Sequence, residues 1–277
     1  MTINCLGDLI NLSQPKILGI LNVTSDSFFD GGTLKNEAAI LERVQKMLTE
    51  GADFIDIGGY SSRPNTTDIS IDEEKNRVIP IIKLLKKEIP NILISIDSFR
   101  SEVAKAALNE GACMVNDISA SSLDPLMMQT AANFQVPYIM MHMKGTPQTM
   151  KQLCKYDNIT KEVNYYFSEK ILQARALGIN DLIIDAGFGF AKDINQNFEL
   201  LNHLELLQFH EVPMLAGLSR KSMIYKTLNT TASEALNGTT ALHMIALQKG
   251  ASILRVHDVK PAKECIELFE KLRKFQN

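Results

Sequence analysis

Short apolar runs recur along the chain, and nearly every one ends in residues that can bind or react. Eight such runs are separated by stretches with helical periodicity. They lie at residues 17–21, 54–57, 92–96, 114–115, 136–141, 182–184, 213–217 and 253–254. A parallel strand covered on both faces reads as a continuous apolar run rather than an alternating one. The pattern therefore predicts a (β/α)8 TIM barrel, whose chemistry sits at the carboxyl ends of its strands.

Three of the intervening stretches show a clear apolar stripe, which predicts helices packed against the barrel. The stripes are Val78, Ile82, Leu85 and Ile89; Val163, Phe167, Ile171 and Ala174, within residues 158–177; and Cys265, Phe269 and Leu272. Asp258 is placed to cap the last helix, and Pro261 is tolerated in its first turn.

The 277 residues match the ~250 typical of one barrel. No linker-like stretch divides the chain, so we expect a single domain over residues 1–277. The net charge of −3 argues against a nucleic-acid partner, and an anionic ligand must then be held by a local cationic pocket. No run approaches the ~18 apolar residues of a membrane span. The four cysteines form no CxxC pair, which favours reduced thiols in a cytoplasmic protein.

Acidic residues follow three of the predicted strands, at Asp97, Asp117 and Asp185. A carboxylate at a barrel mouth needs a hydrogen-bonding or cationic partner, because its desolvation is costly. A flat heterocycle with an amino–imino edge can donate two parallel hydrogen bonds to it, and Asn116 adds a donor and an acceptor. Helix caps or internal salt bridges are the alternative for each acid. Asp56 lies before the end of its strand, and we interpret it as structural, inside the barrel.

A cationic set accompanies these acids: Arg63, Lys221, Arg255 and His257. Arg255 and His257 are two residues apart after the last strand, so they point to the same side of it. Barrels often bind phosphate near their last two strands, which predicts an anionic group here. We interpret His142 as structural, and the methionines around it as an apolar wall.

Eight segments in order resemble the dihydropteroate synthase family, from about residue 17 to 259. They are ILGILNVTSDSFFDGG, IDIGGYSSRPN, ISIDSFR, VNDISA, MHMKGTP, DAGFGFAK, GLSRKSMI and ILRVHDV. The resemblance implies a transferase of folate biosynthesis. It would join 4-aminobenzoate to 6-hydroxymethyl-7,8-dihydropterin diphosphate with the help of Mg²⁺, giving 7,8-dihydropteroate and pyrophosphate. It also implies a cytoplasmic homodimer that contacts its copy through helices near the C-terminal end.

The family motifs further imply site residues. The pterin would be bound by Asp97, Asn116, Asp185 and Lys221. Arg255 would stack on its ring, and the walls of its pocket would be Met141, Gly189 and Phe190. The diphosphate would meet Asn22, Arg255 and His257, with Asn22 as the metal ligand. Aminobenzoate, and the sulfonamides that resemble it, would lie against Phe28, Ser62, Arg63, Pro64, Ser219 and Lys221. The catalytic set would be Asp97, Lys221, Arg255 and His257.

Pyrophosphate is a good leaving group only if its growing charge is met, here by Mg²⁺ and the Arg255/His257 pair. If it departs first, a cationic methylene carbon remains, and Asp97 is the best candidate to stabilise that cation. This dissociative order is a hypothesis. The chain also departs from the usual family pattern at Ser25, Phe29, Tyr60, Ser62, Asn65 and Ala186. Because Tyr60 replaces an acid, it leaves open how the loop over residues 58–69 is anchored.

Other functions fit less well. A methyltetrahydrofolate-dependent corrinoid methyltransferase would share the Asp/Asn pterin floor but has no need for the SRK and RVHD cations. A non-catalytic pterin-binding relative should have lost at least one of the proposed catalytic or diphosphate-binding residues, and none is lost. An unrelated barrel that binds sugar phosphates would not need the acidic residues at the mouth of the barrel.

Overall fold

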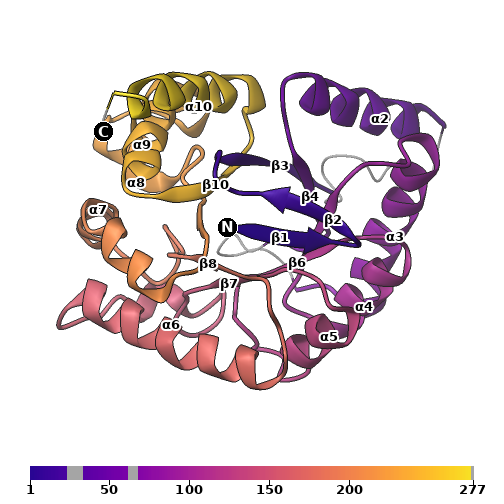
Figure 1. Cartoon of the computed structure of the whole chain (residues 1–277), viewed down its shortest axis with the longest axis horizontal. Helices are drawn as coiled ribbons and strands as arrows, with labels where there is room; N and C mark the ends of the chain where they lie inside the picture. Colours follow the sequence, from indigo (N-terminus) through magenta and orange to yellow (C-terminus); the bar gives the residue numbers. More distant parts are fainter. Residues whose placement is uncertain (24–33, 62–67, 276–277) are drawn as a thin grey trace.

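The chain folds around a closed barrel of eight parallel strands, whose order is β10-β3-β4-β5-β6-β7-β8-β9. A computed structural model describes residues 1–23, 34–61 and 68–275 of the chain. The barrel strands are β3 (Lys16–Asn22), β4 (Phe54–Gly58), β5 (Ile94–Asp97), β6 (Met114–Asp117), β7 (Tyr138–Met141), β8 (Leu182–Asp185), β9 (Met214–Ala216) and β10 (Ala251–Val256). Helices surround them in a ring (Figure 1). The predicted (β/α)8 barrel is confirmed.

Each of the eight predicted apolar runs overlaps one strand of the barrel. Every residue of β4, β6, β7 and β8 is buried, since side chains of one parity fill the interior and those of the other parity pack under the helices. This two-sided burial is why the sequence shows continuous rather than alternating apolar positions.

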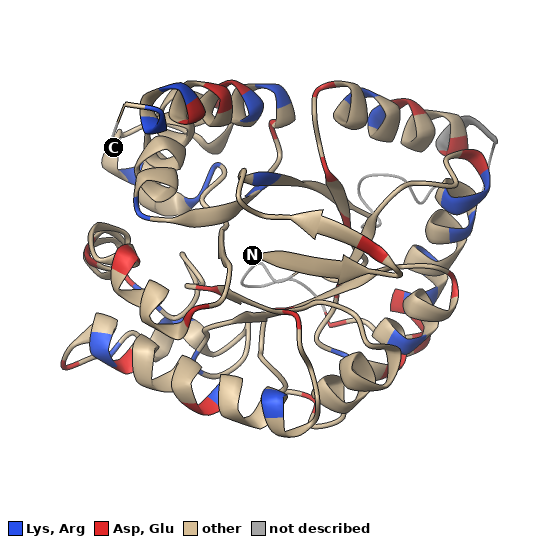
Figure 2. Ribbon diagram, in the orientation of Figure 1, with Lys and Arg blue, Asp and Glu red and all other residues tan. Residues whose placement is uncertain are grey.

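The outer layer consists of helices that follow the strands along the chain. They are α2 (Leu34–Thr49), α3 (Ile71–Glu88), α4 (Ser101–Asn109), α5 (Met127–Phe134), α6 (Ile159–Ala176), α7 (Ile194–Asn202), α8 (Ser222–Thr227), α9 (Leu236–Gln248) and α10 (Val259–Arg273). Short 3-10 turns are η1 (Met150–Gln152), η2 (Leu204–His210) and η3 (Ala232–Glu234). Figure 2 shows basic and acidic residues interspersed around this outer ring. In the described residues, no helix is both long and apolar enough for a membrane crossing.

The predicted helical stripes hold in α3 and α6, where Val78, Ile82 and Phe167 are fully buried. Two expectations for the last helix are wrong. Leu272 is 50% exposed, and Ile266 packs in its place beside Phe269. Asp258 occupies the N-cap position of α10 but makes no side-chain cap bond.

The carboxylate of Asp258 is taken instead by a two-pronged ion pair with Arg220. The Arg220 Nε–Asp258 Oδ2 distance is 2.7 Å, and the Nη2–Oδ1 distance is 3.0 Å. A bidentate guanidinium is a stronger partner for a carboxylate than a backbone amide. Pro261 lies in the first turn of α10, as expected.

A short antiparallel hairpin at the N-terminus was not foreseen from the sequence. It pairs β1 (Thr2–Cys5) with β2 (Asp8–Asn11). Ile3 and Cys5 pack in one cluster with Leu18, Phe54 and other residues from the amino-terminal halves of the barrel strands. In Figure 1 the hairpin lies across the barrel. The hairpin closes the end of the barrel opposite to the carboxyl ends of the strands. All four cysteines of the chain are free thiols.

Candidate active site

Four neighbouring strands end at the same level of the barrel. Asn22 pairs with Gly58, Gly58 with Asp97, and Asp97 with Asn116, across β3 to β6. A Cβ atom on Gly58 would stand 3.3 Å from Asp97 Oδ2, so the glycine leaves room for that carboxylate. The register thus brings three of the predicted site residues to one rim, although they are far apart in sequence.

Arg255 crosses this rim from β10 and joins two carboxylates. Its Nε donates to Asp56 Oδ2 at 2.6 Å, and its Nη2 donates to Asp97 Oδ2 at 2.5 Å. Asn116 Nδ2 donates to the same Asp56 oxygen at 2.9 Å. Asp56 is fully buried, as expected of a structural acid inside the barrel. The sequence interpretation missed that this acid holds two site residues in place. The only signal was an acid within the apolar run FIDI.

The buried charges shift one another. The pKa of Asp97 is raised to about 7, chiefly by burial and also by the Asp56 carboxylate, while Arg255 opposes the rise. Burial alone would lower the pKa of Arg255, but Asp56 and Asp97 raise it above its ordinary value. Arg255 therefore stays charged, while Asp97 changes protonation near neutral pH.

A second acid–base pair lies at the ends of β8 and β9. Asp185 Oδ1 accepts from the Gly187 amide at 2.8 Å. A Cβ on Gly217 would lie 3.7 Å from Asp185 Oδ2 and 3.8 Å from Lys221 Nζ, so both groups flank this glycine. Burial lowers the pKa of Lys221 to about 8, opposed by Asp185, and burial raises the pKa of Asp185, opposed by Lys221.

The same lysine reaches the loop that follows β8. Lys221 Nζ donates to the Phe188 carbonyl and lies 4.9 Å from the centroid of the Phe190 ring. Phe190 in turn packs on a small apolar cluster that includes Met141, Met143 and Met150. The methionines around His142 thus form an apolar wall beside Phe190, as the sequence indicated.

The remaining predicted residues fall into two groups. Ser219 is buried, and its Oγ accepts from the His257 amide at 3.2 Å, which places both beside the end of β10. Asn22 is partly exposed at the end of β3. Four predicted residues of the aminobenzoate site lie outside the described residues: Phe28, Ser62, Arg63 and Pro64. So do Ser25, Phe29 and Asn65.

Asp117 does not join the other acids, because its carboxylate is bound by groups of the following loop and by Tyr138 of β7. Its Oδ1 accepts from the amide and hydroxyl of Ser119. Its Oδ2 accepts from the Ser121 amide at 2.7 Å and from the Tyr138 hydroxyl at 2.6 Å. These four donors use the lone pairs of the carboxylate in fixing the loop after β6.

Tyr60 is anchored at the end of β4. Its hydroxyl accepts from Gln148 Nε2 at 2.9 Å. Its ring meets the Phe99 ring edge-on at 5.0 Å, and the Arg100 guanidinium lies 5.2 Å from its centroid. A tyrosine in place of an acid therefore still ties this strand end to its neighbours.

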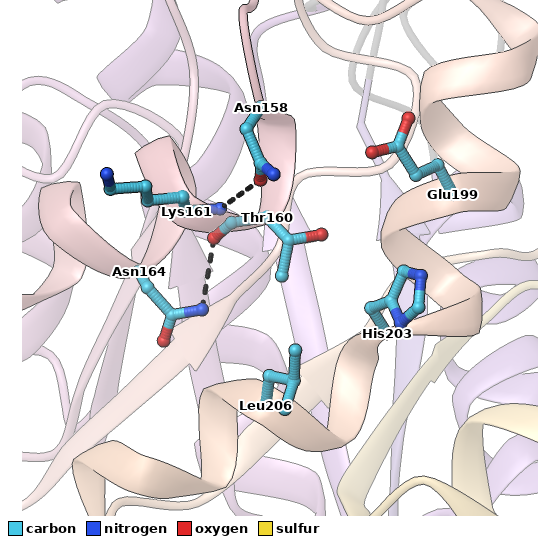
Figure 3. A pocket seen from close by; sticks show the side chains of 7 residues that line it. All are labelled: Asn158, Thr160, Lys161, Asn164, Glu199, His203 and Leu206. Atoms are coloured by element: carbon cyan, nitrogen blue, oxygen red, sulfur yellow. Dashed lines mark hydrogen bonds between the residues drawn. The ribbon is translucent and has the colours of Figure 1, made fainter.

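A separate groove of about 480 Å³ lies among outer-layer residues at α6, α7 and η2. Figure 3 shows the side chains that line it, among them Thr160, Glu199 and His203. None of the residues that converge at the barrel mouth contributes to it. The chemistry of the charged rim therefore belongs to the mouth rather than to this groove.

Comparison with known proteins agrees with this arrangement. The family model described as pterin binding enzyme matches residues 18–257. The dihydropteroate synthase of Escherichia coli K12 is 41% identical over 95% of this chain and 94% of its own. This chain belongs to the dihydropteroate synthase family. It is thus a transferase of folate biosynthesis.

Solved dihydropteroate synthases have the same fold. The Yersinia pestis enzyme, in complex with a sulfonamide drug, superposes with a TM-score of 0.92 at 38% identity, covering 99% of this chain and 100% of its own. The Xanthomonas albilineans enzyme, in complex with 7,8-dihydropteroate, superposes with a TM-score of 0.87 at 36% identity, covering 99% of both chains.

Proposed function

We propose that this dihydropteroate synthase binds the pterin ring among the acids of its barrel mouth and the diphosphate beside the cations. The observation that carries this assignment is the convergence at one rim of Asp97, Asn116, Asp185, Lys221 and Arg255. The amino–imino edge of a pterin donates two parallel hydrogen bonds, which one carboxylate can accept. Asp185 offers a buried carboxylate whose Oδ2 faces Gly217, where no side chain stands in the way.

The pterin slot has walls as well as a polar floor. Met141, Gly189 and Phe190 form one side in this proposal, and Phe190 already packs on the methionine cluster. Lys221 Nζ lies beside Asp185 at Gly217 and 4.9 Å from the centroid of the Phe190 ring, so it can donate to a heteroatom of the pterin ring. Arg255 offers a planar face for stacking while its edge is held by Asp56 and Asp97.

The reaction breaks the bond between the pterin methylene carbon and the diphosphate oxygen. The aminobenzoate nitrogen forms the new C–N bond and then loses a proton. Arg255 and His257 stand at the end of β10, where they stabilise the negative charge that grows on the leaving oxygens. Asp97 would stabilise the methylene cation, and no general base is obligatory because an aniline nitrogen is neutral at pH 7.

The described residues fit a Mg²⁺ ion that arrives with the diphosphate. They contain no group of three His, Cys, Asp or Glu residues able to hold a metal. Asn22 offers one amide oxygen at the rim, next to Gly58 and Asp97. Mg²⁺ commonly takes few protein ligands and several oxygens from waters and phosphates. When bound, it would neutralise charge on the departing pyrophosphate.

The second substrate is proposed to be 4-aminobenzoate, lying on the Lys221 side of the pterin. Ser219 and Lys221 are its described contacts, and Phe28, Ser62, Arg63 and Pro64 complete the proposed set. Support comes from the pairing of Ser219 with His257, which puts this edge beside the leaving group. Sulfonamides are expected to compete at this position.

The chain is further proposed to work as a cytoplasmic homodimer. Large apolar side chains remain exposed on η2 and at the C-cap of α8, with Phe209 84%, Leu206 53% and Leu228 54% exposed. Both η2 and α8 contact α7. Burying these side chains against a second copy would remove them from water. The free thiols are compatible with a reducing compartment.

One turnover experiment tests the function. Purified protein is mixed with the pterin diphosphate, 4-aminobenzoate and Mg²⁺, and both products are quantified. We expect dihydropteroate and pyrophosphate in equal amounts, and no product once EDTA removes the metal. Pterin binding without product, by a folded protein, would favour the non-catalytic alternative. The cation hypothesis predicts that Asp97→Asn lowers turnover even when pterin is saturating. Full turnover in that variant would contradict it.

A further inference from the structure

A buried lysine behind the pterin wall has no role in the scheme above. Lys192 is only 6% exposed and lies just before α7. Its Nζ is 2.9 Å from His142 Nδ1, 3.0 Å from the Gly187 carbonyl and 3.0 Å from the Phe190 carbonyl. The His142 carbonyl follows at 3.3 Å. In the described part of the chain, Lys192 forms no ion pair within 4.0 Å. A buried cation held by carbonyl oxygens and a histidine ring nitrogen calls for an explanation, because its desolvation is costly.

The acceptors around Lys192 belong to two strand ends. His142 follows β7, whereas Gly187 and Phe190 belong to the loop after β8. The two segments touch, since a Cβ on Gly187 would stand 2.1 Å from the His142 carbonyl oxygen. An ammonium group has three donors, and the three shortest contacts match them. Lys192 therefore ties the β8 loop to the end of β7.

This loop is held from both sides. The Phe188 carbonyl faces the site and accepts from Lys221, while the carbonyls of Gly187 and Phe190 face away from it and meet Lys192. The Gly189 amide donates to Asn197 Oδ1 at 2.6 Å. Lys221 is thus positioned to meet substrate, whereas Lys192 contacts only protein.

We propose that Lys192 is a positioning residue for the pterin wall: held by His142, it fixes the carbonyls of Gly187 and Phe190 and thereby the pose of the Gly189–Phe190 surface. The inference rests on the proposed placement of pterin against that surface. Burial lowers the pKa of Lys192 to about 7, opposed by the Asp185 carboxylate. Pre-organised walls of this kind determine how well a flat ligand is held.

The test compares three variants in the full-length protein. Lys192→Met keeps the length and removes the donors, Lys192→Arg keeps charge and donors, and Lys144→Met is the matched control. Lys144 follows the end of β7, and it donates to the Lys155 carbonyl and Glu162 rather than to the carbonyls of Gly187 and Phe190. The readout is the Kd for 6-hydroxymethyl-7,8-dihydropterin, measured by calorimetry. This ligand lacks the diphosphate, so the result does not depend on turnover.

We expect Lys192→Met to raise the pterin Kd at least tenfold, Lys192→Arg to recover most of that loss, and Lys144→Met to stay within threefold of the parent. In turnover, the KM for pterin diphosphate should rise in Lys192→Met more than the KM for aminobenzoate. A purely structural role would instead lower the active fraction with both constants unchanged, and that result would overturn the proposal.

If the methionine variant does not fold, Lys192→Gln takes its place, because it keeps two donors. A threefold to tenfold rise in Kd is then expected, and an unchanged Kd would overturn the proposal. If the parent binds pterin but makes no product, the proposed function fails while this comparison stays valid.

Discussion

Replacing Asp56 with asparagine perturbs the centre of the proposed site without touching substrate. The side chain keeps its shape but loses its charge. In the parent, one Asp56 oxygen accepts from Arg255 at 2.6 Å and from Asn116 at 2.9 Å. In the variant, Arg255 keeps only Asp97 as a charged partner. The guanidinium and the Asn116 amide then lose the negative charge that orients both of them.

The expected losses of stability and activity follow from how deeply the Asp56–Arg255 ion pair is buried. Removing one partner of a buried ion pair typically costs about 3–5 kcal/mol. Because the Arg255 side chain is 22% exposed and Asp97 remains its partner, we expect a smaller loss of unfolding free energy, about 2 kcal/mol. A weakened charge-assisted hydrogen bond costs about 1.5–3 kcal/mol, so kcat/KM should fall about 100-fold, equivalent to roughly 2.7 kcal/mol.

The assay is kcat/KM for pterin diphosphate against pH, together with urea unfolding. Turnover that needs ionised Asp97 should fall as pH drops through about 7 in the parent. The Asp56 carboxylate raises the pKa of Asp97, so its removal lowers that pKa and moves the acid limb to lower pH. Glu102→Gln, in an exposed pair with Lys75, is the control and should change stability by about 0.5 kcal/mol at most. An unchanged kcat/KM, or an acid limb that stays in place, would refute the reasoning.

Three further outcomes are expected. Burial lowers the pKa of His243 to about 4 from 6.5, so the unfolded chain takes up the proton first as pH falls. The free energy of unfolding should therefore decline by up to about 3 kcal/mol between pH 6.5 and pH 4. Urea titrations should show a flatter decline with pH in His243→Leu, and the same decline in both proteins would contradict this. Gly187→Ala places a Cβ 2.1 Å from the His142 carbonyl at a φ of +68°, whereas Gly178→Ala, at +84°, meets nothing within 4 Å. Urea unfolding should show the former losing about 1–3 kcal/mol more than the latter, and equal losses would argue against close loop contact. Phe209→Asp should convert a dimer to a monomer in analytical ultracentrifugation, and a dimer that persists would place the interface elsewhere.

The barrel was predictable because its strands are buried on both faces, so eight apolar runs mark them directly. The N-terminal hairpin was not, because its strands have only four residues each. Their pairing depends on contact with the end of a barrel that forms later in the chain. Asp258 followed the rule for helix caps, but a guanidinium 38 residues away outcompeted the backbone amides.

The site was predictable where a reactive group ends a strand, as at Asp97, Asp185 and Arg255. Asp56 was read as structural because it lies inside a run, and only barrel closure brings it to Arg255, 199 residues later. Lys192 carried no signal of its own, since its acceptors are backbone carbonyls and a ring nitrogen. The local sequence shows which side chain lies at the end of a strand. It does not show which residue of another strand the register places beside that side chain.

The most direct measurement is a crystal structure of the protein with a non-hydrolysable analogue of the pterin diphosphate and Mg²⁺. The proposed placement of the substrate predicts the ring between the Phe190 wall and Arg255, its amino–imino edge at Asp185, and its diphosphate beside Asn22 and His257. A ligand bound in the groove between α6 and α7, or a ring that reaches neither Asp97 nor Asp185, would contradict it.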